Sequence, residues 1–338
     1  MDVAQVLRES AQIRRPMRPV CTRTPLSLLA LAMSLVLGSA CERDGGNAAG
    51  DGDGSGGVGR IRVNLTDAAL DDPDVQTVYV TVTGITLDGE ELPNLTERRT
   101  IDISNYTAGR TIQYGNDQPV SAGTYDGLEL TLDLGRSESG EAPGAYVVDR
   151  EGARLPLDYG PATVTIPAAG AFAVTADEVT ELILDLDLRR AIGYRDGGGY
   201  TFGSDGQLAR SLRLVEEGRS GAIEGTVVNH AATVASDVAR VVYAFPRGTV
   251  TADTLRRGYF GASVSSARVS PGGRFRLSYL PTGRYELVAV DYADVDGDGR
   301  ADLVGARRSD GEIGAETRAV TVSALAQTTI EMIVGEGL

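Results

Sequence analysis

The chain has 338 residues, a formal net charge of −15 and 42% hydrophobic residues. This length allows two domains and a leader, and the apolar content is sufficient for a packed core without disulfides. The negative charge argues against nucleic acid as a partner, because phosphate backbones bind basic surfaces.

Residue types that support thiol or histidine chemistry are scarce. The two cysteines are Cys21 and Cys41, so the chain after residue 41 holds no disulfide and no thiolate metal site. A zinc site or a Ser-His-Asp triad would depend on His230, the single histidine. It follows Val227 and Val228 without Cys or His companions, so we interpret it as a surface loop residue.

The first 41 residues have the features of an export signal. Arginines precede a short apolar run at 26–37, and small residues at 38–40 come directly before Cys41. This order is typical of a signal peptide, and the run is too short to span a membrane. The segment resembles the bacterial lipobox, although Gly38 replaces the usual leucine. The resemblance implies that residues 1–41 are a lipoprotein signal peptide and that Cys41 carries a lipid anchor.

Two alternatives remain open for the leader. An ordinary signal peptidase cut would leave a soluble protein, and a start at Met17 would shorten the basic region. The residue after Cys41 is Glu42. In lipoproteins of this kind an Asp at that position favours the inner membrane, so its absence implies that the protein is anchored in the outer membrane, where it would face the periplasm or the surface. Residues 42–59 are rich in Gly and Asp and lack core-forming residues, so we predict a flexible tether.

Strand patterns dominate from residue 60 onward. Apolar residues alternate with polar ones, which predicts strands with one buried and one solvated face. The apolar sets are Ile61/Val63/Leu65, Val78/Val80/Val82, Leu128/Leu130/Leu132/Leu134 and Leu182/Leu184/Leu186/Leu188. The pattern predicts an all-β protein with two consecutive antiparallel β-sandwich domains, at 60–216 and 220–338.

Most of residues 60–215 resemble an uncharacterised bacterial lipoprotein family. The similar segments are Ile61-Arg-Val-Asn-Leu-Thr-Asp67, Val78-Tyr-Val-Thr-Val-Thr-Gly-Ile85, Val120-Ser-Ala-Gly-Thr-Tyr125 and Leu184-Asp-Leu-Asp-Leu-Arg-Arg190. They resemble the family labelled domain of unknown function 4382. The resemblance implies a β-sandwich on an exported, lipid-anchored protein. It implies no reaction, because the family has no assigned activity.

Several acids of this domain are candidate catalytic groups. Asp185 and Asp187 fall on one strand face with Asp133 or Glu129 nearby, so a carboxylate pair for glycoside hydrolysis is one interpretation. We favour the other interpretation, a solvated strand face in an acidic protein. Asp67 follows a strand and precedes a turn-like stretch, which favours a turn-capping role.

Residues 220–338 begin a second set of strands after the charged hinge at 216–220. Val241-Val-Tyr-Ala-Phe245 and the run at 273–290, which contains Leu280-Pro-Thr-Gly-Arg-Tyr285, are similar to the carboxypeptidase regulatory-like domain. That family is a transthyretin-type sandwich. The resemblance implies a scaffolding or binding module that is not a catalyst.

The stretch Asp294-Val-Asp-Gly-Asp-Gly-Arg-Ala-Asp302 has the ligand spacing of a calcium loop. Hard oxygen ligands must converge on one point, and alternate positions around a tight turn provide this. The predicted ligands of Ca²⁺ are the side chains of Asp294, Asp296 and Asp298, the carbonyl of Arg300, and Asp302 directly or through water. Gly299 would allow the sharp turn.

The loop is not an EF-hand, because no helical pattern flanks it and its twelfth position is Gly305. A missing carboxylate would come from Asp291, Asp310 or Glu312, or be replaced by water. Few fixed ligands predict a Kd on the order of 10⁻⁴–10⁻³ M, and Mg²⁺ fits less well because it keeps more water. The alternative is a hairpin turn without metal, in which close carboxylates would repel one another.

These features predict a non-catalytic envelope lipoprotein, a binding or structural module with one structural Ca²⁺. Its partners would be a membrane through Cys41 and a polysaccharide or another envelope protein. The alternative is a carboxylate-based glycan-acting hydrolase, and a third possibility is that the second domain only spaces the first. We expect no enzyme, since the sequence has no nucleophile elbow and no phosphate-binding glycine loop before a helix.

Overall fold

The computed structural model describes residues 56–333 except positions 71, 73, 196–197, 229, 231–237, 258–259, 298–301 and 309–318. The described residues fall within one compact unit. The predictions for the signal peptide and the lipid anchor on Cys41, and most of the predicted tether, lie outside them.

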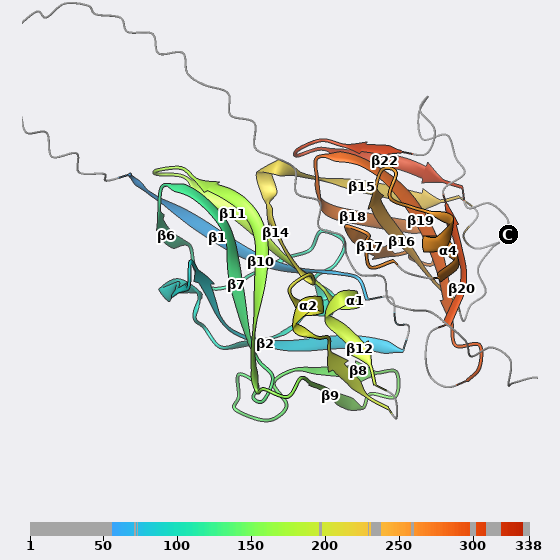
Figure 1. Cartoon of the computed structure of the whole chain (residues 1–338), viewed down its shortest axis with the longest axis horizontal. Helices are drawn as coiled ribbons and strands as arrows, with labels where there is room; N and C mark the ends of the chain where they lie inside the picture. Colours follow the sequence, from blue (N-terminus) through green and yellow to red (C-terminus); the bar gives the residue numbers. More distant parts are fainter. Residues whose placement is uncertain are drawn as a thin grey trace, which may run out of the picture. The chain divides into compact units, whose positions relative to one another are not determined.

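Strands β1–β14 form one continuous hydrogen-bonded sheet, which we call the first strand group (Figure 1). The order is β12-β13-β9-β8-β2-β7-β10-β14-β11-β1-β5, with β3 and β4 beside β2 and β6 beside β1. The strands are β1 (Val58–Ala68), β2 (Val75–Leu87), β3 (Glu90–Glu91), β4 (Arg99–Asp102), β5 (Ile112–Gln113), β6 (Gln118–Ser121), β7 (Gly123–Asp133), β8 (Tyr146–Asp149), β9 (Arg154–Asp158), β10 (Thr163–Val174), β11 (Val179–Asp187), β12 (Ile192–Tyr194), β13 (Tyr200–Phe202) and β14 (Leu212–Glu216).

Short helical segments connect these strands. Helix α1 (Leu188–Ala191) follows β11, and α2 (Asp205–Leu208) follows β13. Within the described residues, 3-10 turns occur at η2 (Pro93–Leu95), η3 (Ile103–Asn105) and η4 (Glu217–Arg219), the last of which leads out of β14.

The alternation seen in the sequence matches the burial of the first strand group. Val78, Val80 and Val82 are at most 1% exposed, and the alternating leucines of β7 and β11 lie in the same core. The prediction of strands with an apolar, buried face is therefore confirmed for β1, β2, β7 and β11.

Strand direction differs in part from the antiparallel prediction. Most described pairs are antiparallel, but β1 runs parallel to β11, with a register from Arg60 opposite Val179 to Ala68 opposite Asp187. Parallel partners cannot be joined by a tight hairpin, and these two strands are far apart in the sequence. Local alternation reports burial and not strand direction, so the sequence pattern did not predict this pairing.

Strands β15–β22 form the second strand group (Figure 1). Of the described strands, β18, β15 and β22 form one sheet, and β17, β16, β19 and β20 form another, with β21 also beside β19. The strands are β15 (Ser220–Val227), β16 (Ala239–Pro246), β17 (Ser265–Arg268), β18 (Arg274–Pro281), β19 (Gly283–Ala293), β20 (Asp302–Arg308), β21 (Val320–Val322) and β22 (Gln327–Met332).

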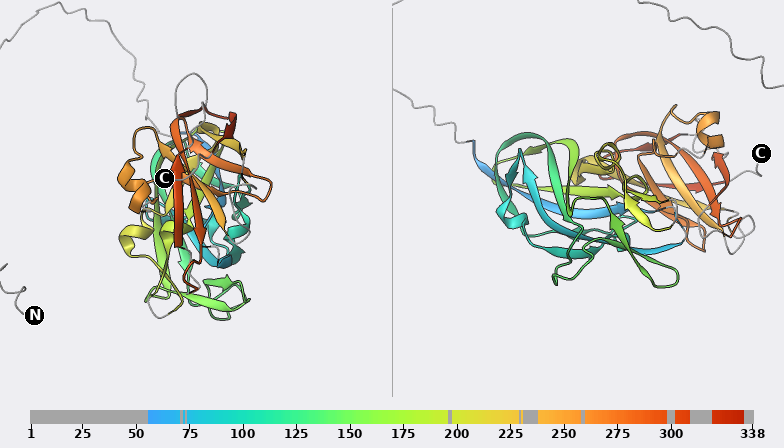
Figure 2. Two further views of the ribbon diagram at one scale, coloured as in Figure 1. Left: turned by 90° about the vertical axis from the view of Figure 1, so that its right-hand side faces the viewer. Right: turned by 60° about the horizontal axis from the view of Figure 1, so that its bottom comes forward.

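The second strand group has apolar residues on both faces of its larger sheet. Val242 and Ala244 pack toward the smaller sheet, while Tyr243 and Phe245 belong to a separate cluster on the other face. Helix α4 (Ala252–Arg257) contributes Leu255 to that second cluster and lies outside the strands (Figure 2). This double burial explains the unbroken apolar run of β16.

The all-β fold class is confirmed, with sandwich-type packing of sheets. Strand β14 belongs to the sheet of the first strand group, and β15 belongs to a different sheet. The passage from one sheet to the other lies close to the predicted boundary at 216–220. The division into two domains stays a prediction, because the described residues form one compact unit.

Candidate metal centre and buried ion pairs

The candidate metal centre lies on the loop between β19 and β20. These strands form a hairpin in which Ala293 pairs with Asp302, so Asp302 returns to the point where the loop leaves β19. Gly297 takes part in the turn with a φ of +76°, which glycine adopts without strain. One ligand atom from each of Asp294, Asp296 and Asp302 lies within 4.8 Å of the other two.

Backbone hydrogen bonds position two of these carboxylates. The N–H of Gly297 donates to Asp294 Oδ1 at 2.7 Å, and the N–H of Val295 donates to Asp302 Oδ2 at 3.2 Å. Two oxygens that bind one Ca²⁺ lie at most about 5 Å apart, because each Ca–O distance is about 2.3–2.6 Å. The spacing of the three carboxylates is therefore compatible with one calcium ion.

The remaining predicted ligands are not positioned by the structure. Asp298 and the carbonyl of Arg300 lie outside the described residues. So do Asp310 and Glu312, two of the acids considered as sources of the missing carboxylate ligand. Of the predicted set, the structure brings together Asp294, Asp296 and Asp302, which the sequence spacing had identified.

Asp291, the third acid considered as a source of the missing carboxylate ligand, forms a buried ion pair. Arg240 donates to its carboxylate from Nε at 2.6 Å and from Nη2 at 2.8 Å.

The pKa of His230 is lowered by burial and by the positive charge of Arg240, and Asp291 acts in the opposite direction. His230 is half-buried, so it is less exposed than a free surface loop residue, and it lies near charges that come from two distant strands.

Asp74 is an acid near the metal centre that the sequence analysis missed. It lies on the connection between β1 and β2. Burial raises the pKa of its carboxyl, the charges of Asp72 and Asp294 raise it further, and Arg150, at 3.4 Å, lowers it. No local pattern could have revealed this neighbour, because Asp74 and Asp294 are brought together only by the tertiary structure.

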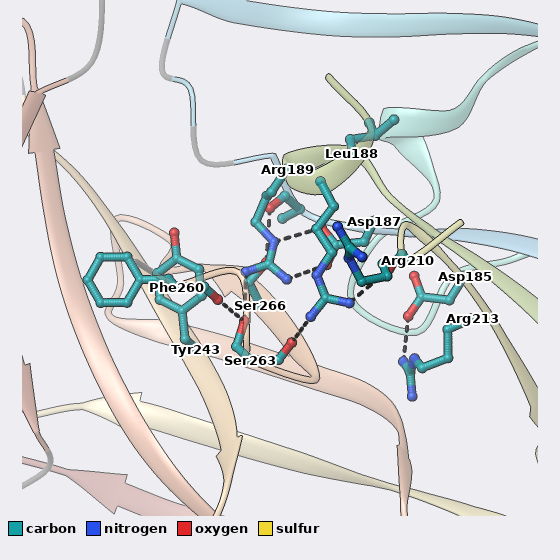
Figure 3. Close-up of polar contacts among 12 residues, drawn as sticks. Asp185, Asp187, Leu188, Arg189, Arg210, Arg213, Tyr243, Phe260, Ser263 and Ser266 are labelled. Carbon is teal, nitrogen blue, oxygen red and sulfur yellow. Dashed lines mark hydrogen bonds and ion pairs between the residues drawn. The ribbon is translucent and has the colours of Figure 1, made fainter. Parts of the chain in front are cut away.

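Five charged residues near the end of β11 are buried or half-buried and form a group that we call the arginine cluster; Figure 3 labels four of them, all except Arg190. Its members are Asp185, Asp187, Arg189, Arg190 and Arg213. Asp187 Oδ2 lies 2.5 Å from Arg189 Nη2 and 3.2 Å from Arg190 Nε. Asp185 forms an ion pair with Arg213, which lies directly opposite it on β14.

The arginine cluster also bonds to the second strand group (Figure 3). Arg189 Nη1 donates to Ser263 Oγ at 2.9 Å, and Arg190 donates to the carbonyl of Ser263. Arg213 Nη1 donates to the carbonyl of Tyr279 at 2.5 Å. The cluster therefore neutralises buried carboxylates and joins the two strand groups through the same guanidinium groups.

The prediction of a solvated face for Asp185 and Asp187 is wrong. Their side chains are 5% and 7% exposed, because the second strand group covers that face of β11. A buried carboxylate is costly unless it is paired and hydrogen-bonded, and both acids have arginine partners. The alternation of Leu with Asp did not show what would cover the polar face.

The other candidate acids also have structural partners. Asp133 Oδ2 lies 2.7 Å from Arg98, and its Oδ1 accepts two backbone N–H groups of the turn after β7. Burial opposes ionisation, but these bonds hold the pKa of Asp133 below its usual value. Glu129 accepts a hydrogen bond from the Thr86 hydroxyl at 2.9 Å.

Asp67 does not cap a local turn as predicted. It lies within β1, is 5% exposed, and accepts a hydrogen bond from the N–H of Leu188 at 3.3 Å. It therefore serves the start of α1, far along the chain, and this contact depends on the parallel pairing of β1 with β11.

A cavity of about 350 Å³ lies where η4 approaches β18, and its walls include Glu217, Arg276 and Tyr279. Glu217 is hydrogen-bonded to Glu181. This hydrogen bond, burial and the charge of Glu181 raise the pKa of Glu217 to about 7. The hollow lies beside η4, the segment that connects the two strand groups.

Comparison with known proteins found a family model that matches part of the chain. Residues 58–204 match the family described as Domain of unknown function (DUF4382), so the predicted resemblance is confirmed over this range. No curated protein matches the chain. Within the described residues, no helix is long and apolar enough to cross a membrane.

Solved structures show only distant likeness. The Bacillus anthracis TIE protein is 12% identical over 82% of this chain and 34% of its own, with a TM-score of 0.19, so the chain spans about a third of its length. BcpA, the major pilin subunit of Bacillus cereus, is 10% identical over 82% and 71%, with a TM-score of 0.18. The fimbrial anchor protein Mfa2 from Porphyromonas gingivalis is 9% identical over 72% and 80%, also with a TM-score of 0.18.

Proposed function

We propose that the protein is a non-catalytic lipoprotein of the bacterial envelope that acts as a binding or structural module. Residues 1–41 contain arginines, then an apolar run, then small residues, and this order supports export of the protein. A lipid on Cys41 would anchor the chain, and Glu42 after it favours the outer membrane. The family match over residues 58–204 agrees with this proposal, since the resemblance implies exported, lipid-anchored proteins.

The proposal that the protein is not a catalyst is supported by the ion pairs and hydrogen bonds that hold the candidate acids. Asp185 and Asp187 are buried in ion pairs with arginines, and Asp133 is bound by Arg98 and two backbone N–H groups. A glycosidase needs two carboxyl groups that flank the bond to be cut, one of which gives up a proton. Carboxylates fixed by arginines away from a substrate are unsuited to that work.

The second strand group is proposed to be a carboxypeptidase regulatory-like module. Support comes from its two sheets, which share an apolar core that includes Ile223, Leu277 and Leu287. Such a module would supply a binding surface for polysaccharide or another envelope protein, or would act as a spacer for the first strand group.

We also propose one structural Ca²⁺ on the loop between β19 and β20. Asp294, Asp296 and Asp302 would bind it, with Asp298 and the carbonyl of Arg300 completing the set. The convergence of three carboxylates, close enough for one ion, supports this proposal. The ion would neutralise their repulsion and hold the hairpin closed.

A panel of envelope polysaccharides, assayed for both binding and hydrolysis, tests the proposed function. The full mature chain is expected to release no new reducing ends from any glycan, whether or not it binds one. Reproducible hydrolysis that Asp185→Asn or Asp133→Asn abolishes, and that the exposed control Asp126→Asn leaves intact, would overturn the proposal. Asp126 is a suitable control because it lies exposed on β7.

A further inference from the structure

Polar side chains gather on the outward face of the smaller sheet of the second strand group, beside η4. Arg276 and Ser278 alternate on β18 with residues of the apolar core, so their side chains point away from that core. Glu224 lies directly opposite Arg276 on β15, and Gln327 reaches the same group from β22. Strand alternation therefore places these four polar side chains together on one face.

Strand β18 is irregular where it borders the hollow beside η4. Ser278 and Tyr279 together face the single residue Ala222 of β15, and Tyr279 has a φ of +53°, which is rare for a bulky residue. Regular alternation would turn Tyr279 to the face opposite Ser278, but the extra residue of the bulge lets both line the hollow. Tyr279 also donates from its hydroxyl to the carbonyl of Gly109 at 2.9 Å, so its ring closes one side of the hollow.

Gly109 lets a loop of the first strand group lie close on this sheet face. Its φ is +88°, and a Cβ there would come within 2.8 Å of Ser278 Oγ and 2.9 Å of Arg276 Nε. The hollow beside this contact has a volume of about 350 Å³, and its walls also include Glu217 and Leu325. This volume lies at the lower end of the range of ligand sites, about 300–1,000 Å³, and suits one small ring.

The hollow presents hydrogen-bond donors. Arg276 donates from Nη1 to Glu224 and Gln327 and from Nε to Ser278 Oγ at 3.1 Å. The N–H groups of its Nη2, and the hydroxyl hydrogen of Ser278, have no partner among the residues that the structure describes. Both side chains are half-buried, so these donors are within reach of a ligand in the hollow. They call for a ligand that carries acceptor oxygens.

Carboxyl groups beside these donors restrict the charge of the ligand. Glu224 neutralises Arg276, and Glu217 is hydrogen-bonded to Glu181. These acids would repel an anion, and an ammonium group could not accept the hydrogen bonds of Arg276. A neutral molecule with several hydroxyl groups satisfies both conditions, because a hydroxyl accepts from N–H groups and donates to carboxyl oxygens.

We propose that this hollow binds one neutral hexopyranose unit of a polysaccharide. Hydroxyl oxygens of the sugar accept from Arg276 Nη2 and from the Ser278 hydroxyl, and another sugar hydroxyl donates to Glu217. The C–H side of the ring packs against Leu325, which is 77% exposed at the rim. This inference rests on the proposed function of a polysaccharide-binding module and names the site on that module.

Titration of the full mature chain with methyl glucopyranoside, methyl galactopyranoside and methyl mannopyranoside tests the proposal, followed by calorimetry and saturation-transfer NMR. We expect saturable binding of at least one of the three. The methyl uronide of the same sugar, which carries a carboxylate in place of the hydroxymethyl group, should bind at least about tenfold more weakly, because the carboxylate meets Glu217 and Glu224.

Two variants locate the binding. Ser278→Ala removes one donor and should weaken binding about fivefold, as expected for one neutral hydrogen bond. Ala326→Tyr fills the hollow from its wall and should abolish binding. Thr329→Ala is the control, since Thr329 is exposed on β22 and does not border the hollow. An unchanged unfolding temperature of Ser278→Ala separates the loss of a contact from a folding defect.

The outcomes distinguish this site from the proposed function. The hollow is not a sugar site if none of the three glycosides binds, if the uronide binds as tightly as the glycoside, or if binding survives in both variants. An envelope polysaccharide that binds wild type and both variants equally would place glycan binding elsewhere on the chain, and the proposed function would stand. Hydrolysis of a polysaccharide would overturn the proposed function and leave the glycoside affinities of the hollow unchanged.

Discussion

At Glu217 a single proton links two carboxyl groups. Glu217 is hydrogen-bonded to Glu181, whose Oε1 also lies 2.7 Å from Arg62 Nη1. Two carboxyl groups can share a hydrogen bond only when one of them is protonated. The pKa of Glu217 is therefore raised to about 7, whereas an unfolded glutamate titrates near 4.3.

This pair should make stability fall as the pH rises. Between about pH 4.3 and pH 7 the folded chain retains a proton that the unfolded chain has lost, so its stabilising effect is complete below the unfolded pKa. The effect disappears as the pH rises through about 7. Glu217→Gln supplies a permanent donor to Glu181 and should remove this component of the pH dependence.

Thermal unfolding from pH 4.5 to pH 8.5 measures the difference between wild type and Glu217→Gln. The variant should gain roughly 2 °C over wild type at pH 8 and little at pH 4.5, since partial exposure weakens the effect. Glu178→Gln, at an exposed position near the start of β11, is the matched control and should run parallel to wild type. Parallel curves for Glu217→Gln would contradict the assignment.

At the scale of elements, the β19–β20 hairpin depends on the charge balance of its loop. Three carboxylates converge on that loop, and Asp74 contributes further negative charge from another connection. Without a cation these groups repel one another, so the loop should be the part of the hairpin most sensitive to divalent ions.

Calcium at 10 mM should raise the unfolding temperature of the wild-type chain. With a Kd on the order of 10⁻⁴–10⁻³ M, binding would contribute about 1.4–2.7 kcal/mol. Asp296→Ala removes one of the converging carboxylates and should abolish the response, while the exposed Asp126→Ala on β7 should keep it. Calorimetry with and without Ca²⁺ or Mg²⁺ checks this, and an unchanged wild-type transition would exclude the calcium site.

At the scale of the whole molecule, the arginine cluster holds the two strand groups together. Arg189 binds Asp187 and Ser263, and its guanidinium lies 5.1 Å from the centre of the Tyr243 ring. Further contacts join the groups, including the Ser266 hydroxyl to the carbonyl of Ala69 at 3.0 Å. The described part of the chain should therefore unfold as one cooperative unit.

Arg189→Met should lower the free energy of unfolding by about 3 kcal/mol, because it leaves the buried carboxylate of Asp187 with one partner fewer. Urea unfolding measures this, and a double-mutant cycle with Ser263→Ala should reveal a coupling of about 1 kcal/mol between the groups. Arg195→Met breaks an exposed ion pair with Asp158 and should cost less than about 1 kcal/mol. Equal losses in both arginine variants would show that the cluster does not join the groups.

The sequence was informative wherever the physics is local. Alternating apolar residues predicted the buried faces of β2 and β7, because side chains on a strand alternate sides whatever the strand packs against. The spacing of Asp294, Asp296 and Asp302 predicted their convergence, since a tight turn between paired strands returns the chain to the same point.

The tertiary structure alone decided the roles of Asp67, Asp185 and Asp187. Their burial depends on β1 running beside β11 and on the second strand group covering that face, and both contacts join segments far apart in the chain. The sequence pattern predicted that Asp185 and Asp187 are solvated. In the structure both form buried ion pairs, because arginines from α1 and β14 reach them. Local pattern determines which residues can share a face, and long-range packing determines what that face meets.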